Sequence, residues 1–240
     1  MYDDQERRLE ENPNNRNRSN SGVILTRDQY IDFDVKIGNR IGEGAYGQVY
    51  KCLNLDYGGF VAVKHIDLKG TTLGPEIDIA SLCQEIELYQ TLNHDHIVKY
   101  LGAKANEDSI YIYMEYMPSG SINSMLKQYG AFEVNVIKKF TKQIVLGLEY
   151  LHSKDVVHRD VKGGNILHDG YGNVKLADFG AAKLLENIHE SNSLTNSEVC
   201  NSIKGSLYWM APELFDQKKH GRKIDIWSLG CTVIEMATGQ

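Results

Sequence analysis

The chain has 240 residues, of which 42% are hydrophobic and 24% charged, so it can form one large domain or two small lobes with a real core. Its formal net charge of −6 gives no reason to expect nucleic acid or an anionic membrane as the main partner. The four cysteines form no Cys-x-x-Cys pair, which disfavours a zinc site and a disulfide scaffold and favours reduced thiols in a cytoplasmic or nuclear protein. No apolar run approaches the length that spans a bilayer.

The N-terminal segment differs in composition from the rest of the chain. Residues 1–22 are rich in Asn and charged side chains and nearly lack apolar ones, so they resemble no signal peptide. We expect residues 1–34 to form a disordered or loosely ordered tail. A docking or regulatory role for this tail is a less favoured alternative.

Alternating apolar and polar residues then predict a series of strands. These runs cover residues 34–38, 48–53, 60–66, 97–101 and 109–114 and are separated by glycine turns. Between the third and fourth runs, apolar residues at three- and four-residue steps from Ile79 to Leu92 predict a helix that starts near Pro75.

The second part of the chain is mainly helical in pattern. An apolar stripe over residues 134–151 predicts an amphipathic helix, and residues 223–238 are apolar nearly all round, which predicts a buried core helix. A strand-rich part followed by a helix-rich part predicts an α+β protein with two lobes.

Residues 42–49 read Gly-x-Gly-x-x-Gly-x-Val, a pattern that lets a backbone approach phosphate oxygens closely. A predicted strand follows the third glycine, whereas a helix would follow it in a dinucleotide-binding fold. No Gly-Lys-Ser/Thr follows either, which excludes a P-loop. The loop is therefore interpreted as a hairpin tip, for which a glycine turn without any ligand is the alternative.

Lys64 ends the apolar run 61–64, where a buried cation needs an anionic partner. Nucleotide phosphates are one such partner, and a carboxylate on the following helix is another. Glu85 is our candidate because apolar residues of the inward stripe flank it, while Glu87 is the competing choice.

Two further segments are too polar for core strands. Residues 156–167 place four polar or charged side chains between short apolar anchors, which predicts a rigidly held loop. In residues 174–180 a short strand is followed by Asp178, an aromatic residue and a glycine. A long polar segment then leads to Ala-Pro-Glu at 211–213.

Taken in order, these motifs resemble those of the eukaryotic protein kinases. The match consists of the glycine loop, Val-Ala-Val-Lys, His-Arg-Asp-x-Lys-x-x-Asn, Asp-Phe-Gly and Ala-Pro-Glu, and it covers about residues 35–240. The resemblance implies a bilobal kinase fold with a β-rich N-lobe and hinge at 35–117 and a helical C-lobe at 118–240.

The resemblance also implies roles for individual residues. Lys64, paired with Glu85, would hold the α- and β-phosphates of ATP, and Asp160 would accept or orient the proton of the substrate hydroxyl. Asn165 and Asp178 would hold Mg²⁺. Lys162 resembles the lysine that contacts the γ-phosphate in serine/threonine kinases.

Residues 113–118 resemble the hinge, with Met114 as the gatekeeper and the backbone of Glu115 and Met117 meeting adenine. The complete set of nucleotide contacts implied by the resemblance is Ile41, Gly42, Glu43, Gly44, Ala45, Tyr46, Gly47, Val49, Ala62, Lys64, Met114, Glu115, Met117, Asn165, Leu167 and Asp178.

The segment from Asp178 to Glu213 resembles an activation segment that is ordered by phosphorylation. Ser202 would be the activating site, modified by an upstream kinase or by autophosphorylation. Arg159 would be its partner, and Ser206 would lie beside the catalytic Asp and Lys.

Within the kinases, the Val-Lys-Gly-Gly-Asn and Gly-Ser-Leu-Tyr-Trp-Met-Ala-Pro-Glu stretches resemble the sterile-type group, which includes the MAP kinase kinase kinases. Residues 85–88 and 92–102 are similar to the branch containing the septation-initiation kinases.

Three features depart from the pattern. Leu207 replaces a usual proline, and Tyr89 stands where a smaller aliphatic residue usually joins the hydrophobic spine. The resemblance breaks off within the central C-lobe helix, before the arginine that would pair with Glu213. We therefore expect an incomplete C-lobe, in a fragment or a truncated gene product of low stability.

The resulting functional hypothesis is a serine/threonine protein kinase of a MAP kinase-like cascade that uses ATP and Mg²⁺ on protein substrates such as a downstream kinase. Its expected location is the cytoplasm, without nucleic acid as a partner. The alternative is a nucleotide-binding but catalytically weak fragment or scaffold. A metabolic phosphotransferase is disfavoured because Ala-Pro-Glu shapes a platform for protein substrates.

Overall fold

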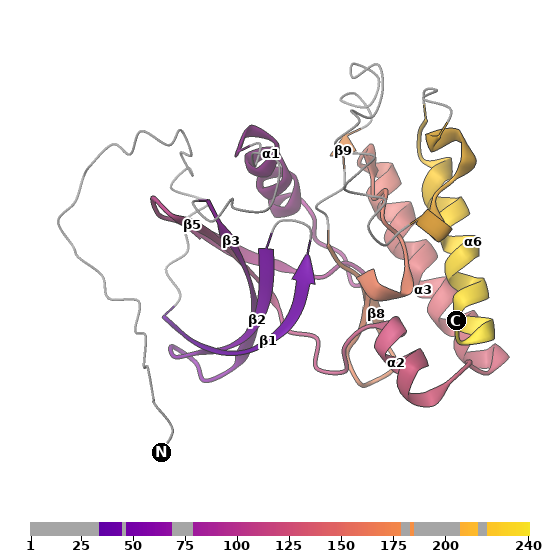
Figure 1. Ribbon diagram of the computed structural model, residues 1–240, viewed down its shortest axis with the longest axis horizontal. Helices are drawn as coiled ribbons and strands as arrows, with labels where there is room; N and C mark the ends of the chain where they lie inside the picture. The colour runs from indigo at the N-terminus through magenta and orange to yellow at the C-terminus, as the bar shows by residue number, and fades with distance from the viewer. Residues whose placement is uncertain (1–33, 45–46, 69–78, 179–182, 185–206, 216–219) are drawn as a thin grey trace.

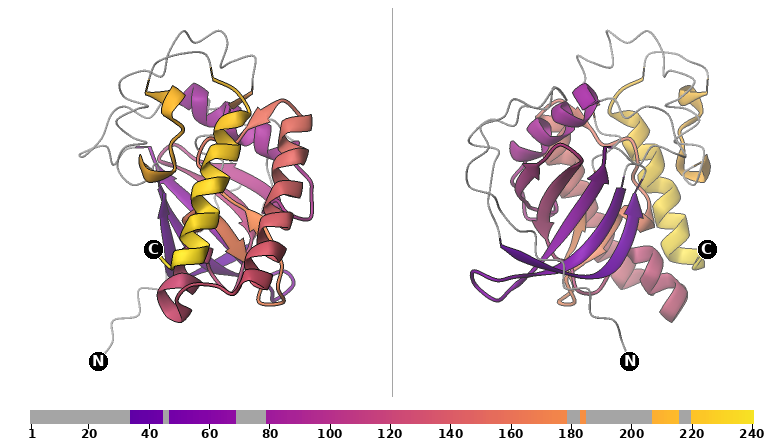
Figure 2. Two further views of the ribbon diagram at one scale, coloured as in Figure 1. Left: turned by 90° about the vertical axis from the view of Figure 1, so that its right-hand side faces the viewer. Right: turned by 60° about the vertical axis from the view of Figure 1, so that its left-hand side comes forward.

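The computed structural model describes residues 34–44, 47–68, 79–178, 183–184, 207–215 and 220–240 (Figure 1). The first part of the chain forms one antiparallel sheet of five strands, in the order β1-β2-β3-β5-β4. The strands are β1 (Val35–Gly44), β2 (Gly47–Asn54), β3 (Phe60–Asp67), β4 (Tyr100–Ala105) and β5 (Ser109–Glu115). Figure 2 shows how strongly this sheet is curved.

Period-two patterning explains the sheet, because alternate residues of a strand face opposite sides. Lys64 of β3 pairs in register with Val49 of β2 and Ile112 of β5, so these side chains share one face. Cys52, Val61, Val63 and Tyr113 form a separate buried cluster of their own. The predicted strands are confirmed, except that the fourth begins at Tyr100 rather than residue 97.

Helix α1 (Ile79–Gln90) crosses between β3 and β4. The predicted helix is confirmed over these residues, while the expected start near Pro75 lies outside the described part of the chain. Ile86 packs with Ile66, Ile110 and Ile112 of the sheet, and Tyr89 packs in the larger cluster that extends into the helical part.

The helical part contains α2 (Ile122–Tyr129), α3 (Val134–Ser153) and α6 (Lys223–Thr238). A capping box begins α2, in which the Ser121 side chain accepts from the backbone N–H of Ser124 and the Ser124 hydroxyl accepts from that of Ser121. Figures 1 and 2 both show α3 and α6 side by side. The predicted stripe on α3 is confirmed, since Phe140, Ile144, Leu148 and Leu151 are buried in the main core.

Short elements connect the two parts. They are the strands β6 (Val156–Val157), β7 (Ile166–His168), β8 (Val174–Leu176) and β9 (Lys183–Leu184) and the 3-10 turns η1 (Gly163–Asn165), η2 (Leu207–Trp209) and η3 (Pro212–Leu214). Strand β6 pairs with β9, and β7 pairs with β8. The loop of residues 158–165 is thus held between paired strands, as the sequence predicts.

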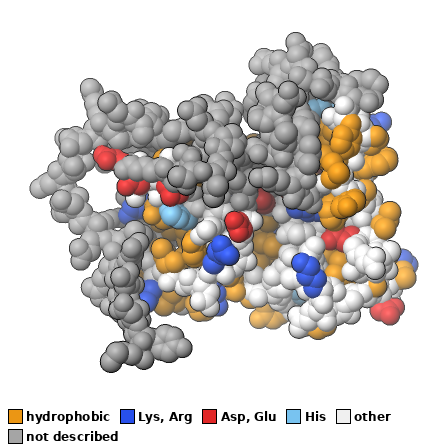
Figure 3. Space-filling model, in the orientation of Figure 1, with side chains coloured by type: hydrophobic (Ala, Val, Ile, Leu, Met, Phe, Trp, Pro, Cys, Tyr) orange, Lys and Arg blue, Asp and Glu red, His pale blue; other side chains and the backbone are white. Residues whose placement is uncertain are grey.

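Helix α6 is buried on one face only, which differs from the prediction of a fully buried core helix. Ile224, Leu229 and Met236 are buried, whereas Ile226, Trp227 and Ile234 are 50–64% exposed. Figure 3 shows apolar side chains gathered on this side of the molecule. Among the described residues, α3, the loop 158–165 and η2 pack against α6, while the apolar side chains on its outer face stay exposed.

The cysteines of the described part are free thiols: Cys52, Cys83 and Cys231. Burial raises the pKa of each thiol above its ordinary value, and the charge of Glu87 adds to the effect at Cys83. These three residues therefore stay protonated at neutral pH and are poor nucleophiles.

Candidate active site

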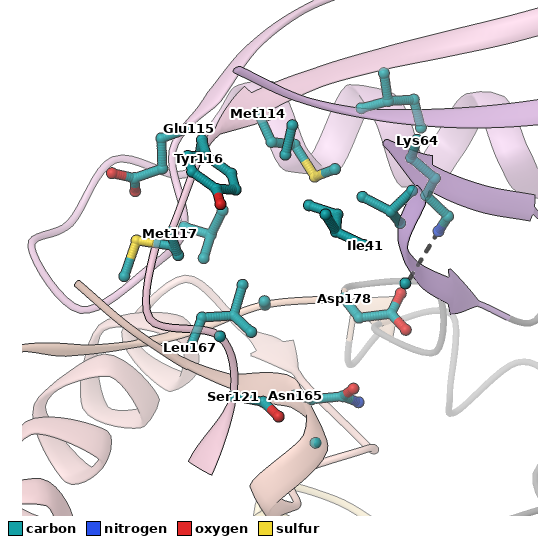
Figure 4. A pocket seen from close by; sticks show the side chains of 18 of the residues that line it. Ile41, Lys64, Met114, Glu115, Tyr116, Met117, Ser121, Asn165, Leu167 and Asp178 are labelled. Atoms are coloured by element: carbon teal, nitrogen blue, oxygen red, sulfur yellow. Dashed lines mark hydrogen bonds and ion pairs between the residues drawn. The ribbon is translucent and has the colours of Figure 1, made fainter. Parts of the chain in front are cut away.

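A cavity of about 490 Å³ lies between the five-stranded sheet and the helical part. Its upper wall comes from β1, β2 and β3, its back from the end of β5 and residues 116–118, and its floor from Leu167 and Asp178 (Figure 4). The cavity is lined by Ile41, Gly42, Glu43, Val49, Ala62, Lys64, Tyr89, Val98, Ile112, Met114, Glu115, Tyr116, Met117, Pro118, Gly120, Ser121, Ser124, Gly164, Asn165, Leu167, Ala177 and Asp178.

Most of the nucleotide contacts predicted from the sequence line this one cavity. The exceptions among the described residues are Gly44 and Gly47, which do not line the cavity. These two residues lie opposite each other at the end of the β1–β2 hairpin. Ala45 and Tyr46 lie outside the described residues. The hairpin itself agrees with the interpretation of the glycine motif, because Gly44 pairs with Gly47 across the two strands.

Gly47 is needed for packing against the neighbouring strand. A Cβ at this position would lie 2.2 Å from the backbone oxygen of His65 on β3, a distance that no side chain tolerates. The third glycine of the motif therefore lets β2 approach β3 closely.

Lys64 projects from β3 into the cavity and is only 6% exposed. Its Nζ lies 3.5 Å from Oδ1 of Asp178, so the buried cation has an anionic neighbour, although this carboxylate is not on the following helix where the sequence analysis placed a partner (Figure 4). The expected partner Glu85 lies on α1, but its side chain is outside the described part of the structure, and the predicted Lys64–Glu85 pair stays a prediction.

Three side chains of the loop 158–165 form a hydrogen-bonded group. Lys162 Nζ donates to both carboxylate oxygens of Asp160, at 2.8 and 3.1 Å. Asn165 Nδ2 donates to the backbone oxygen of Asp160 at 2.9 Å and to its Oδ2 at 2.8 Å. Because the Asn165 amide nitrogen is used in this way, its oxygen is the atom left to bind a ligand.

His158 supports this loop from within the core. It is fully buried, its Nδ1 accepts the N–H of Asp160 at 3.3 Å, and its Nε2 lies 3.2 Å from the backbone oxygen of Ala177. The tautomer with the proton on Nε2 satisfies both contacts. The ring thereby joins the loop of Asp160 to the residue before Asp178.

Asp225 of α6 holds the same loop from the other side. Its fully buried carboxylate accepts the backbone N–H groups of His158 at 3.0 Å and Arg159 at 2.8 Å, and lies 2.7 Å from His152 Nε2. Arg159 needs such support, because its φ of 69° is unfavourable for a non-glycine residue.

Glu235 lies further along α6 than Asp225 and is also buried, and it makes a second set of hydrogen bonds, one of them to the loop. Its carboxylate accepts the backbone N–H of Gly163 at 2.9 Å and the Trp209 Nε1–H at 3.1 Å. Asn123 Nδ2 of α2 lies 3.5 Å from its other oxygen. This one side chain therefore connects the loop, η2 and α2.

Sequence reasoning did not assign roles to Asp225, Glu235 and His158. The available signal was an acid within an apolar helix, since a buried carboxylate needs donors to satisfy it. Tyr89, noted in the sequence only as a departure, lines the cavity and packs against Tyr100 with ring centroids 5.6 Å apart. Ser202 and Ser206 lie outside the described residues.

Comparison with known proteins agrees with this geometry. The model of the protein kinase domain matches residues 35–240. The chain is similar to mitogen-activated protein kinase kinase kinase A of Dictyostelium discoideum, with 45% identity over 205 residues, which are 85% of this chain and 21% of that protein.

Two further relatives carry related names. Mitogen-activated protein kinase kinase kinase 3 of Arabidopsis thaliana is 46% identical over 206 residues, covering 85% of this chain and 31% of the relative. The human protein of the same name is 44% identical over 217 residues, covering 90% and 34%. The chain thus spans a fifth to a third of the length of these relatives. Within the part of the chain that is described, no helix is long and apolar enough to cross a membrane.

Proposed function

The chain belongs to the protein kinase domain family, and we propose that it transfers the γ-phosphate of ATP to serine or threonine hydroxyls of proteins within a MAP kinase-type cascade. The observation that carries the proposal is the hydrogen-bonded group of Asp160, Lys162 and Asn165, because Asn165 also lines the cavity that holds Lys64 and Asp178. Relatives named as MAP kinase kinase kinases support the choice of cascade and of a downstream kinase as substrate.

Adenine is proposed to bind at the back of the cavity, against the backbone of Glu115 and Met117. Ala62 of β3 and Leu167 of β7 line the cavity with apolar side chains, which suit a flat heteroaromatic ring. Lys64 is proposed to hold the α- and β-phosphates, because it is the buried cation on the upper wall.

Protein kinases typically use Mg²⁺ with ATP, and the donor atoms here fit that ion. The carboxylate of Asp178 and the amide oxygen of Asn165 are hard oxygen ligands at one end of the cavity. Because Mg²⁺ takes six oxygen ligands, phosphate oxygens and water would supply those that these two side chains do not. When bound, Mg²⁺ neutralises phosphate charge and orients the γ-phosphate for in-line transfer.

Asp160 is proposed to accept or orient the proton of the substrate hydroxyl. Lys162 and Asn165 fix its carboxylate, so the acceptor is oriented before the substrate arrives. Lys162 is proposed to place its charge on the γ-phosphate, where negative charge must be balanced during transfer.

We further propose that phosphorylation of Ser202, by an upstream kinase or by the chain itself, activates the protein through Arg159. The support is the place of Arg159 directly beside Asp160 and its strained backbone, which ties any movement of Arg159 to the catalytic loop. The cytoplasm is the proposed location, because the similarity to proteins named as mitogen-activated protein kinase kinase kinases supports a place in a signalling cascade.

The proposal is tested by incubating the purified protein with ATP, Mg²⁺ and a catalytically inactive MAP kinase kinase, and measuring phosphate on the substrate. Asp160→Asn is expected to lower kcat by about 10²- to 10⁴-fold, because the proton acceptor is lost. Asp56→Asn, which changes an exposed carboxylate in the β2–β3 turn, is the matched control and should retain full activity.

Phosphate transfer that Asp160→Asn abolishes and Asp56→Asn retains would support the proposed function. Nucleotide binding without transfer, in the wild type and with several protein substrates, would instead favour a nucleotide-binding scaffold. Equal activity of the wild type and Asp160→Asn would contradict the catalytic role.

A further inference from the structure

The side chain of Glu115 points away from the cavity that its backbone lines. Figure 4 shows its carboxylate directed outward, while Met114 and Leu167 face the interior. Glu115 is the last residue of β5 and begins the connection between the two parts of the molecule. Contacts that fix the Glu115 side chain therefore also help to fix the Glu115 backbone, which lines the cavity.

Two separate segments bind the Glu115 carboxylate. Lys175 Nζ lies 2.7 Å from its Oε1 and 2.9 Å from its Oε2, and the backbone N–H of Lys99 donates to Oε1 at 2.6 Å. The N–H of Glu115 donates in turn to the backbone oxygen of Lys99 at 3.0 Å. The side chain is thus fixed at both oxygens, and the backbone is fixed beside it.

Lys175 is the middle residue of β8, the strand that leads to Asp178. The neighbouring Leu176 donates its N–H to His96 at 2.9 Å and accepts the N–H of Val98 at 2.9 Å. The end of β5, residues 96–99 and β8 are therefore joined by both backbone and side-chain bonds. Through Lys175, the adenine end of the cavity is linked to the strand that positions Asp178.

An exposed ion pair would contribute little to the stability of this part of the fold, because solvent screens its charges and its side chains lose conformational entropy. This pair is better placed, since the side chains of Lys175 and Glu115 are only 20% and 26% exposed. The ammonium contacts both oxygens of a carboxylate that also accepts a backbone N–H, and charge-assisted bonds of this kind are the stronger ones.

We propose that Lys175 is a positioning residue for nucleotide binding, which acts by holding Glu115 so that the hinge backbone is ordered before adenine arrives. This inference rests on the proposed function, since it assumes that the cavity binds ATP. Without the Lys175 cation, the Glu115 carboxylate turns towards water and the hinge is less ordered in the free protein. Ordering the hinge when the nucleotide binds then costs free energy, which weakens nucleotide binding. Lys175 makes no contact with Asp160 or Lys162, so the phosphate-transfer step itself is unaffected.

The test compares Lys175→Met with the wild type in two assays. Calorimetric titration with ADP and Mg²⁺ gives the nucleotide Kd without any turnover, and phosphorylation of a protein substrate gives kcat and the KM for ATP. Lys175→Met is expected to raise the Kd for ADP and the KM for ATP about fivefold, with kcat within twofold of the wild type.

Four further variants separate positioning from general damage to the fold. Lys175→Arg keeps a cation that can reach both oxygens and is expected to remain within twofold of the wild-type Kd. Glu115→Gln keeps the acceptor for Lys99 but loses the charge, and Glu115→Gln with Lys175→Met should be no weaker than either single variant. Lys138→Met changes an exposed lysine on α3 and is the matched control.

An unchanged Kd for ADP in Lys175→Met would overturn the inference, as would additive effects in the double variant or an equal loss in Lys175→Arg. The two proposals fail separately. If no substrate is phosphorylated but Lys175→Met still binds ADP about fivefold more weakly, the kinase activity is refuted and the positioning role stands. If phosphorylation is normal and the ADP affinity is unchanged, only the positioning role is refuted.

Discussion

The buried carboxylate of Asp225 accepts the backbone N–H of Arg159 at 2.8 Å, although 66 residues separate the two in sequence. The bond holds Arg159 in a left-handed conformation, which costs a non-glycine residue about 1–3 kcal/mol. Asp160 follows directly, so the direction of its side chain depends on this bond. A residue of α6 therefore shapes the proposed catalytic loop without lining the cavity.

Removal of this carboxylate should disable the loop. Asp225→Ala leaves two backbone N–H groups and His152 without their acceptor in a buried place, and we expect a loss of about 3–5 kcal/mol in the free energy of unfolding. Asp225→Asn keeps one acceptor oxygen and should lose less stability, while its kcat falls at least tenfold. Urea unfolding and the phosphorylation assay check both values, with Asp56→Asn as the control. A variant Asp225→Asn with wild-type kcat would show that Asp160 is oriented without Asp225.

Gly163 provides a second test of the connection between α6 and the loop. A Cβ at Gly163 would lie 2.4 Å from Oε1 of Glu235, so Gly163→Ala must displace either the carboxylate or the loop. We expect a loss of about 1–3 kcal/mol in stability, as for overpacked sites, and a kcat reduced at least tenfold.

Gly164→Ala is the matched comparison for this prediction, because its Cβ would meet only Lys162 Cε at 3.8 Å. Its loss of kcat should be much smaller than that of Gly163→Ala. Thermal melting measures the stability of both variants, and initial rates of phosphorylation measure their kcat. Equal losses of stability and kcat in the two variants would mean that the contact between Glu235 and Gly163 does not position the loop.

Local patterns predicted most of the fold. Strands β2, β3 and β5 and helices α3 and α6 follow from period-two and helical apolar patterns, which depend only on neighbours along the chain. The start of the fourth strand was predicted three residues too early, because Ile97 and Val98 are apolar for a reason unrelated to the five-stranded sheet. They lie beside β8, where Ile97 bridges to Leu176, instead of joining the five-stranded sheet.

The candidate site was predicted through the resemblance, and its supporting contacts were not. Lys64, Asp160 and Asn165 stand in recognisable motifs, whereas Asp225 and Glu235 act across 66 to 72 residues. No spacing in the sequence indicates which loop a helical acid reaches. The pairing of Glu115 with Lys175 was missed for the same reason, because 60 residues separate the two along the chain.

The contact between Lys162 and Asp160 predicts a specific kinetic defect. Lys162→Met removes the cation that fixes the Asp160 carboxylate and that is proposed to meet the γ-phosphate. We expect kcat to fall about 10²-fold, with little change in the Kd for ADP, because ADP lacks the γ-phosphate. Steady-state rates and ADP titration provide the two measurements. A large loss of ADP affinity would contradict the placement of Lys162 at the transfer step.

Finally, His94 predicts a pH dependence of stability at the turn after α1. Its ring stacks on Tyr150 with centroids 4.9 Å apart, and its Nδ1 accepts the N–H of His96 at 3.1 Å. Burial, together with the charge of His96, lowers the pKa of His94, while Asp95 and Glu149 oppose the shift. Protonation of Nδ1 would also break the bond to His96.

Because the folded-state pKa of His94 lies below its unfolded value of about 6.5, the unfolded state binds more protons between these two values. The stability due to uncharged His94 is therefore complete above about pH 6.5 and declines as the pH falls towards the folded-state pKa. The total should stay under about 1 kcal/mol, since the ring is partly exposed to solvent. Urea unfolding at pH 7.5, 6.5 and 5.5 should give a shallower decline in His94→Gln than in the wild type. Parallel curves for the two proteins would show that another group carries the pH dependence.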